Sequence, residues 1–168
     1  AKAGLSAGAD LINDIWGLKW DGRLAALIAE NGAACCLMHN RKQMDYKDYL
    51  LDFMDDMRET LRIADDAGIK REKIMLDPGV GFAKTYEQNL SIIKHLDLLK
   101  EFGLPVLLGT SRKSVIGTAL DLPVDEREEG TVATTVMGRM NGATIFRVHD
   151  VKKNYRAMKM AEAILAAE

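Results

Sequence analysis

Five short apolar segments alternate with helical segments along the chain. We expect these segments to form strands, which would lie at 10–15, 33–38, 73–77, 105–109 and 143–148. Most are apolar at successive positions, as strands are when both faces of a parallel sheet are covered. The repeated order of strand and helix predicts an α/β fold in which right-handed crossovers join parallel strands.

Helical periodicity fills the intervals between these strands. Residues 48–67 place apolar side chains three and four positions apart, which predicts an amphipathic helix. Gly68 follows at the position of a left-handed C-terminal cap. Further helices are expected between Asp21 and Gly32, over 129–141 and over 151–167.

A capping box is expected at Thr85 and Gln88, whose side chains can each bond the backbone N–H of the other residue. We expect the helix that they begin to bury Leu90 and Ile93 and to end near Gly103. A glycine ends a helix readily because it adopts a left-handed backbone without strain.

Two architectures fit this alternation, an open doubly wound sheet and part of a (β/α)₈ barrel. Five strands do not close the usual barrel, which takes about 250 residues, whereas this chain has 168. Both architectures bind ligands at the C-terminal ends of their strands. No linker or low-complexity tract divides the sequence, so we expect a single domain.

Composition and charge limit the classes of partner. The net charge is −2, from 23 basic and 25 acidic residues, so neither nucleic acid nor an acidic membrane is indicated. No apolar run approaches the roughly 18 residues of a membrane-spanning helix. Cys35 and Cys36 are adjacent, so in a strand their side chains point to opposite faces and do not pair. A reducing cytoplasm is the simplest compartment.

Polar side chains stand where four of the expected strands end. Parallel strands bring their C-terminal ends to one edge, so we expect a composite site there. Asp77 ends the third strand, and Pro78 and Gly79 let the chain leave the sheet in a tight turn. The Asp77 carboxylate can accept two hydrogen bonds from the N–H edge of a heterocycle. The alternative is an aspartate that caps an ordinary turn.

The fourth strand leads into a segment, 109–114, that combines hydroxyls, a guanidinium and an ammonium. Lys113 can donate to a ring carbonyl or nitrogen, and Ser111 or Arg112 can hold a second substrate. A solvated basic loop is the alternative. The position of segment 109–114 directly after an apolar strand favours the binding role.

The last strand ends at Arg147-Val148-His149-Asp150. Alternation along an extended chain places the Arg147 and His149 side chains on the same side. Two donors beside the start of a helix predict a site for phosphate or pyrophosphate. The alternative is a surface arginine–aspartate pair in which Asp150 caps the helix.

Two further strand-end residues give weaker signals. Asn13 can read the edge of a heterocycle because its amide both donates and accepts, although a structural role is the alternative. His39 follows the second strand, and we expect it to be hydrogen-bonded structure rather than a ligand. The three histidines show no metal-ligand spacing, so no metal ligand is assigned.

Taken together, these motifs resemble those of the dihydropteroate synthases, the pterin-binding enzymes of folate biosynthesis. The matching segments are 7–15, 37–39, 76–85, 109–114 and 147–150, in the family's order. The resemblance implies a TIM barrel, the (β/α)₈ fold, of which these five strands are the fourth to eighth. It also implies a transferase that joins p-aminobenzoate to 6-hydroxymethyl-7,8-dihydropterin diphosphate and releases pyrophosphate.

The resemblance assigns substrate contacts to four of these five segments, all except 37–39. These contacts are Asn13, Asp77 and Lys113 for the pterin, Arg147 and His149 for the diphosphate, and Phe82, Ser111 and Arg112 for the aminobenzoate. Cations at a departing diphosphate lower the barrier electrostatically, and a carboxylate stabilises positive charge on the pterin. The catalytic candidates are therefore Asp77, Lys113, Arg147 and His149.

The family's first three strands have no counterpart in this sequence. Residues 1–5 look like the end of a helix already under way, so we expect one pterin-binding barrel domain over 1–168 that is incomplete at its N-terminus. A loop associated with magnesium belongs to the missing part, so Mg²⁺ is expected for the family and no ligand for it here. We expect little or no activity from this chain alone, and self-association through its open sheet edges, as a dimer or other homo-oligomer.

Two rival functions remain open. The pterin-binding domain of a corrinoid-dependent methyltransferase shares the barrel, the Asn-Asp pair and the Asp-Pro-Gly turn. It has no need of the Ser-Arg-Lys loop or of the Arg-Val-His strand end, which argues against it. The other rival is a non-catalytic half-barrel that binds a ligand or assembles with a partner.

Overall fold

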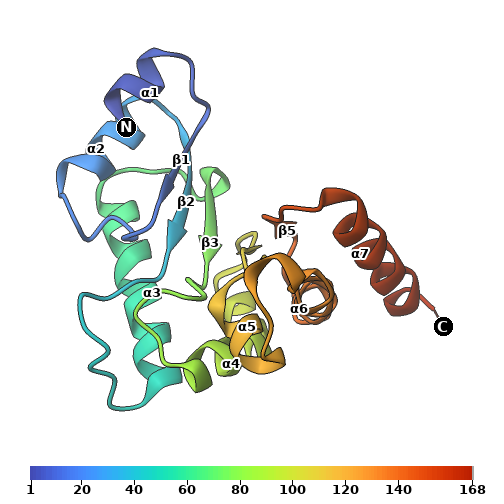
Figure 1. The fold of residues 1–168 in the computed structure, drawn as a ribbon. Coiled ribbons are helices and arrows are strands. Elements are labelled where there is room, and N and C mark those ends of the chain that lie inside the picture. The colour runs from blue at the N-terminus through green and yellow to red at the C-terminus, as the bar shows by residue number, and fades with distance from the viewer. Residues whose placement is uncertain (168) are drawn as a thin grey trace.

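Five parallel strands and seven α-helices alternate in the computed structural model, which describes residues 1–167 (Figure 1). The strands are β1 (Leu11–Asp14), β2 (Ala34–Met38), β3 (Ile74–Asp77), β4 (Leu107–Leu108) and β5 (Ile145–Phe146). The helices are α1 (Lys2–Ser6), α2 (Arg23–Glu30), α3 (Tyr49–Asp66), α4 (Tyr86–Lys94), α5 (Ser114–Leu120), α6 (Glu128–Met140) and α7 (Val151–Leu165). Short 3₁₀ turns add η1 (Arg71–Lys73), η2 (Leu96–Phe102) and η3 (Val124–Glu126).

The strands follow one another in space in the order of the sequence. β1, β2 and β3 form one parallel sheet, and β4 pairs with β5 in a second. A parallel bridge between Leu76 and Val106 joins the two sheets. A doubly wound sheet reverses its strand order, and no reversal occurs within residues 1–167. The arrangement is therefore the predicted partial barrel, with no closing contact between β1 and β5 among these residues.

The two faces of the β1–β3 sheet differ in character. Cys35, Leu37 and Leu76 point to the helices and belong to the buried core, to which α3 adds Phe53 and Met57. Because side chains alternate along a strand, the register places a different set on the opposite, concave face. That set is Asn13, Cys36, Met38, Met75 and Asp77. The helical layer thus covers one face and leaves the polar strand ends on the other.

Local capping explains where two long helices begin and end. Asp48 caps α3 by accepting a hydrogen bond from the Leu51 backbone N–H at 3.2 Å. Gly68, just past the end of α3, has φ +81°, as predicted for a left-handed cap. The capping box of Thr85 and Gln88 is present at the start of α4, which confirms the prediction.

The predicted course of α4 is partly wrong. Leu90 is 42% exposed, whereas Ile93 is buried as predicted. Asn89 takes the inward position instead, because its Oδ1 accepts from the Gly81 backbone N–H at 2.6 Å and ties α4 to the preceding loop. The helix ends at Lys94, and the 3₁₀ turn η2 continues to Phe102, followed by Gly103 in the left-handed region.

Other elements differ from the prediction in length or number. Strands were expected over 105–109 and 143–148, but β4 and β5 have two residues each. Backbone hydrogen bonds from Leu76 to Pro105 and from Arg147 to Leu108 extend the pairing beyond them. Helix α5 was not predicted from the sequence. Cys35 and Cys36 are both buried free thiols, as expected. Within residues 1–167, no helix is long and apolar enough to cross a membrane.

Candidate functional site

Asp77 lies at the C-terminal end of β3, on the concave face. Its side chain is buried, and its Oδ1 accepts a hydrogen bond from the Gly79 backbone N–H at 2.8 Å. Burial raises the pKa of Asp77, while the Gly79 hydrogen bond and the nearby charges of Lys113 and Arg147 act in the opposite direction. The carboxylate is thus held in place by the backbone and lies within the field of two cations.

The turn after Asp77 rests directly on the end of β2. Gly79 has φ +68°, and a Cβ atom at this position would lie 2.0 Å from the carbonyl oxygen of His39. Gly81 has φ +84°, and a Cβ atom there would lie 3.2 Å from Cδ of Lys113. Glycine is required at Gly79, because a side chain would meet backbone there, and it is favoured at Gly81, where the positive φ strains other residues.

Lys113 spans the gap between the β4 and β3 strand ends. Its ammonium donates a hydrogen bond to the backbone carbonyl of Val80 and lies 4.8 Å from the centre of the Phe82 ring. Burial lowers the pKa of Lys113, and the charge of Asp77 opposes that shift. The cation is therefore placed beside the Asp77 turn with a half-buried aromatic ring next to it.

Ser111 and His149 connect the ends of β4 and β5. The Oγ of Ser111 lies 2.7 Å from Nδ1 of His149 and accepts from the His149 backbone N–H at 3.1 Å. Arg147 approaches the same strand end, since a Cβ atom at Gly109 would lie 3.3 Å from its guanidinium. These groups share a small pocket, which is lined by Gly109, Ser111, Lys113, Arg147, Val148 and His149.

Arg112 points away from this pocket. Its Nε lies 3.7 Å from Oε2 of Glu128, a buried carboxylate on α6. Its backbone adopts φ +58°, with the N–H donating to Oγ1 of Thr131 at 3.1 Å. The structure therefore separates Arg112 from Ser111 and Lys113, its neighbours in the predicted motif.

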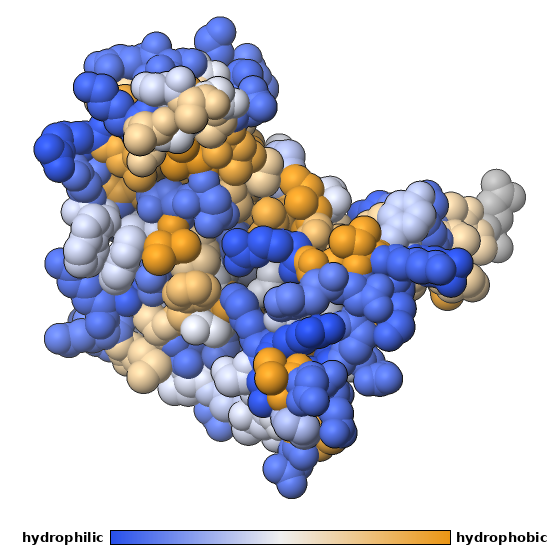
Figure 2. All heavy atoms as spheres, turned by 45° about the horizontal axis from the view of Figure 1, so that its top comes forward, coloured by the Kyte–Doolittle hydropathy of each residue, from blue (hydrophilic) through white to orange (hydrophobic). Residues whose placement is uncertain are grey.

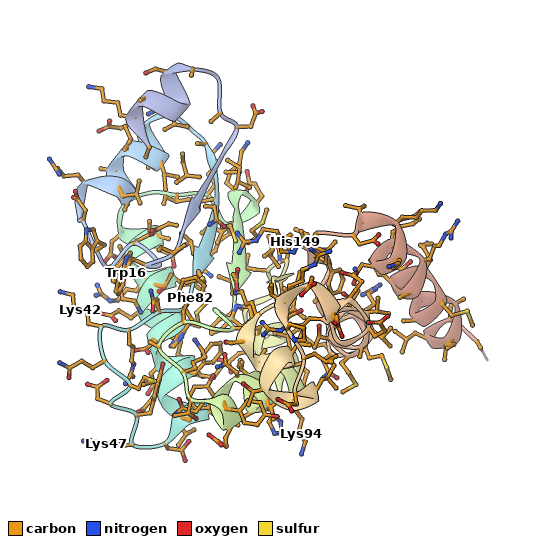
Figure 3. The ribbon with its side chains drawn as sticks, viewed as in Figure 1. Trp16, Lys42, Lys47, Phe82, Lys94 and His149 are labelled. Carbon is orange, nitrogen blue, oxygen red and sulfur yellow. The ribbon has the colours of Figure 1, made fainter. Side chains whose placement is uncertain are left out.

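Asn13 and Phe82 occupy the rim of the concave face. Asn13 is an exposed residue of β1, with its Cα paired to that of Cys36. Phe82 lies on the segment after β3, and His149 lies beside β5 on the segment that leads to α7 (Figure 3). Seven of the eight predicted residues thus lie at the strand ends that surround this face, and Arg112 is turned to α6.

Two buried residues with no predicted ligand role lie behind the Asp77 turn. His39 is fully buried, in agreement with the expectation that it is hydrogen-bonded structure. Lys84 belongs to the segment 76–85, which matches the family, and it is only 8% exposed. No local pattern marks a lysine as buried, so the sequence carried no signal for it beyond its place in that motif.

The donor set does not fit a metal ion. No group of three or more histidine, cysteine or acidic side chains is placed to hold one within residues 1–167. The pocket between β4 and β5 presents Lys113, Arg147 and His149, which suit an anion better than Mg²⁺, a cation that prefers oxygen ligands. We therefore assign no step to a metal on residues of this chain.

The strand ends thus bring together a buried carboxylate, Asp77, the neighbouring ammonium of Lys113, and a pocket lined by Arg147 and His149. Barrel proteins of parallel strands place their functional sites at this end. The profile of the pterin binding enzymes matches residues 1–149. The chain belongs to this pterin-binding enzyme family.

Curated relatives share one activity. The chain is 56% identical over 166 residues to the dihydropteroate synthase of Clostridium beijerinckii, a match that covers 98% of the chain and 62% of that protein. It is 48% identical over 165 residues to the dihydropteroate synthase of Bacillus subtilis, covering 98% of the chain and 58% of that protein. The chain therefore spans about three-fifths of the length of these relatives.

Solved structures confirm the fold. A dihydropteroate synthase from Clostridium difficile, crystallised in the presence of pteroic acid, superposes with a TM-score of 0.95 at 44% identity, covering 99% of this chain and 64% of that one. A Yersinia pestis dihydropteroate synthase in a sulfonamide complex gives a TM-score of 0.91 at 40% identity, covering 98% and 62%. The partial barrel is thus the arrangement that this part of the family adopts.

Proposed function

We propose that this chain carries the pterin and diphosphate contacts of a dihydropteroate synthase. The reaction would join p-aminobenzoate to 6-hydroxymethyl-7,8-dihydropterin diphosphate and release pyrophosphate. The observation that carries the proposal is the convergence of Asp77, Lys113, Arg147 and His149 at adjacent strand ends of one face. Membership of the pterin-binding family supports the choice of heterocycle.

The pterin would bind between Asp77 and Lys113. The Asp77 oxygen that is not engaged by Gly79 can accept from the N–H edge of the ring, and Lys113 can donate to a ring carbonyl or nitrogen. Asn13, on β1, would hydrogen-bond to a further edge of the pterin ring. A carboxylate in this position also stabilises positive charge that develops on the pterin as its CH₂–O bond breaks.

The diphosphate would bind at Arg147 and His149. Arginine binds phosphate oxygens with two parallel hydrogen bonds, and the imidazole adds a third donor. Negative charge grows on the departing oxygen in the transition state, so these donors stabilise the transition state more than the bound substrate. The amine of p-aminobenzoate needs only to be positioned for attack, and no covalent enzyme intermediate is required.

Of the three expected aminobenzoate contacts, Phe82 is the one that is placed to bind directly. Phe82 offers a half-buried ring beside Lys113, and it fits an aromatic second substrate. Ser111 is already bonded to His149, so its first role is to orient that imidazole. Arg112 would reach the aminobenzoate only after it leaves Glu128.

Mg²⁺, compartment and assembly remain part of the proposal. Magnesium would accompany the diphosphate, without ligands from this chain. Free buried thiols at Cys35 and Cys36 support a reducing cytoplasm. Apolar side chains reach the surface in several places (Figure 2), and those of α6 and α7 include Met137, Met140, Tyr155, Met160 and Ile164. A homo-oligomer, dimeric in the simplest case, would cover such surface, and small-angle scattering over a concentration series tests it.

The direct test is product formation with radiolabelled p-aminobenzoate and the pterin diphosphate. We expect slow dihydropteroate formation at most from this chain, because no pairing of β1 with β5 closes the sheet within residues 1–167. Any turnover should disappear in Asp77→Asn. Binding of methyltetrahydrofolate without binding of the pterin diphosphate would instead favour the corrinoid-dependent methyltransferase domain. Oligomerisation without binding of either ligand would favour the non-catalytic module.

A further inference from the structure

Lys84 makes three polar contacts from a buried position. Its Nζ lies 3.0 Å from the carbonyl oxygen of Gly79, 3.0 Å from that of Phe82 and 2.9 Å from Nδ1 of His39. The side chain is 8% exposed. Two of the three acceptors are therefore backbone atoms of the turn that follows Asp77.

The number of donors on a lysine ammonium matches this set of acceptors. A charged ammonium has three N–H groups and can bond all three atoms, whereas a neutral amine would leave one of them unmatched. Burial lowers the pKa of Lys84 to about 7, while the charges of Asp77 and Asp56 raise it and that of Lys113 lowers it. An unmatched buried acceptor costs free energy, so the contacts favour the charged form.

His39 fixes the direction from which Lys84 approaches. Burial lowers the pKa of His39 to about 4, so its imidazole is neutral near pH 7. Because Nδ1 faces the ammonium of Lys84, we assign the ring proton to Nε2, which lies 2.9 Å from Oδ2 of Asp56. Arg41 donates to the same oxygen at 2.6 Å. The ammonium is thus supported from α3 through one continuous set of contacts.

The backbone that Lys84 holds carries two parts of the proposed site. Val80 lies between the two bonded carbonyls and accepts the hydrogen bond from Lys113. Phe82, whose own carbonyl is bonded, places its ring 4.8 Å from the ammonium of Lys113. The turn also runs close to β2, because a Cβ atom at Gly79 would lie 2.0 Å from the carbonyl oxygen of His39.

We propose that Lys84 is a positioning residue for the pterin site, which fixes the turn from Gly79 to Phe82 so that Lys113 and Phe82 meet the ring. This role rests on the proposed function. It assigns Lys84 no contact with substrate, and it makes a specific claim: the pterin half of the site depends on Lys84. The proposed diphosphate contacts, Arg147 and His149, do not, because none of the hydrogen bonds of Lys84 reaches them.

The test compares Lys84→Met with Lys94→Met, which removes an exposed ammonium from α4. Calorimetry would measure binding of 6-hydroxymethylpterin and, separately, of pyrophosphate. Hydrogen exchange would follow the amides of residues 79–82 without ligand. In Lys84→Met we expect pterin affinity to fall about tenfold or more, as loss of charged hydrogen bonds predicts, with pyrophosphate affinity within about twofold of the parent. Faster exchange at 79–82 should accompany this change, and Lys94→Met should match the parent.

Two results would overturn the proposal. One is unchanged pterin affinity in Lys84→Met, and the other is an equal loss of both ligands, which would make Lys84 a residue of general stability. If the parent binds no pterin, the proposed function fails, and the positioning role is then judged by exchange alone. In that case unchanged exchange at 79–82 in Lys84→Met overturns it, and faster exchange than in Lys94→Met supports it.

Discussion

Nδ1 of His149 lies 2.7 Å from Oγ of Ser111, and the same oxygen accepts the backbone N–H of His149. Since the Ser111 oxygen already accepts one hydrogen bond, its own proton is available for Nδ1. We therefore assign the Ser111 hydroxyl as the donor to Nδ1, with the ring N–H on Nε2. This tautomer leaves an N–H donor on the side of the ring away from Ser111, where an anion held by Arg147 can receive it.

Replacement of Ser111 by alanine should release His149. We expect pyrophosphate affinity to fall about five- to tenfold, the effect of one lost hydrogen bond that orients a donor. Calorimetric titration with pyrophosphate measures it, and Thr118→Ala, which removes an exposed hydroxyl from α5, serves as the control. An unchanged affinity in Ser111→Ala would show that the contact does not orient the imidazole for an anion.

Replacement of Arg147 by methionine removes the main anion donor and keeps most of the side-chain volume. Charged hydrogen bonds are stronger than neutral ones, so pyrophosphate affinity should fall about tenfold to a hundredfold. Arg156→Met, at an exposed position of α7, should bind as the parent does. The measured affinity of the parent should also decline with added salt, and this decline should be smaller in Arg147→Met.

A comparison of Gly79 with Gly103 separates the free-energy cost of backbone strain from that of a close contact. Both have positive φ, +68° and +63°, but a Cβ atom would meet the His39 carbonyl oxygen at 2.0 Å only at Gly79. We expect Gly103→Ala to lower the free energy of unfolding by about 1 kcal/mol through strain alone. Gly79→Ala should cost more than about 2 kcal/mol and should also weaken pterin binding. Urea unfolding of both variants measures this, and equal costs would contradict the close approach.

The buried imidazole of His39 should make the protein sensitive to acid. Burial lowers the pKa of His39 from 6.5 to about 4. Between these values the unfolded chain binds a proton that the folded chain does not. His39 therefore does not reduce stability above pH 6.5, and it reduces stability increasingly as the pH drops towards 4. The loss attributable to His39 is on the order of 3 kcal/mol.

Thermal unfolding from pH 7 to pH 4 provides the measurement. His39→Asn should be less stable than the parent at pH 7, because its contacts with Lys84 and Asp56 are altered. The midpoint temperature of His39→Asn should nevertheless fall less steeply than that of the parent as the pH is lowered. Asp56 contributes little in this range, because hydrogen bonds from His39 and Arg41 outweigh burial and bring its pKa to about 2. Equal slopes in the two proteins would refute a neutral buried His39.

The sequence predicted those parts of the site that depend on strand ends. Asp77 and His149 could be assigned to the same edge of the sheet from the pattern alone, because parallel strands deliver their C-terminal residues to one edge. The capping box at Thr85 was equally accessible, since its two side chains lie within one turn of helix. In each case the prediction depends on residues close in sequence or on the regular alternation of strands and helices.

Other features depend on contacts between residues far apart in the sequence. Arg112 pairs with Glu128, and His39 with both Asp56 and Lys84, through packing that no spacing rule describes. Leu90 was assigned to the core from helical periodicity, but the hydrogen bond of Asn89 to the Asp77 turn set the phase of α4. Polar contacts can therefore decide which face of a helix is buried when the apolar pattern is short.

Calorimetric titration of the chain with 6-hydroxymethylpterin tests the central claim, with Asp77→Asn and Lys113→Ala measured beside it. Asp97→Asn and Lys94→Ala change the same residue types at exposed positions and serve as controls. We predict binding by the parent and both controls, and at least about a tenfold loss of affinity in Asp77→Asn and in Lys113→Ala. No binding by the parent, or equal binding by all five proteins, would contradict a pterin site between Asp77 and Lys113.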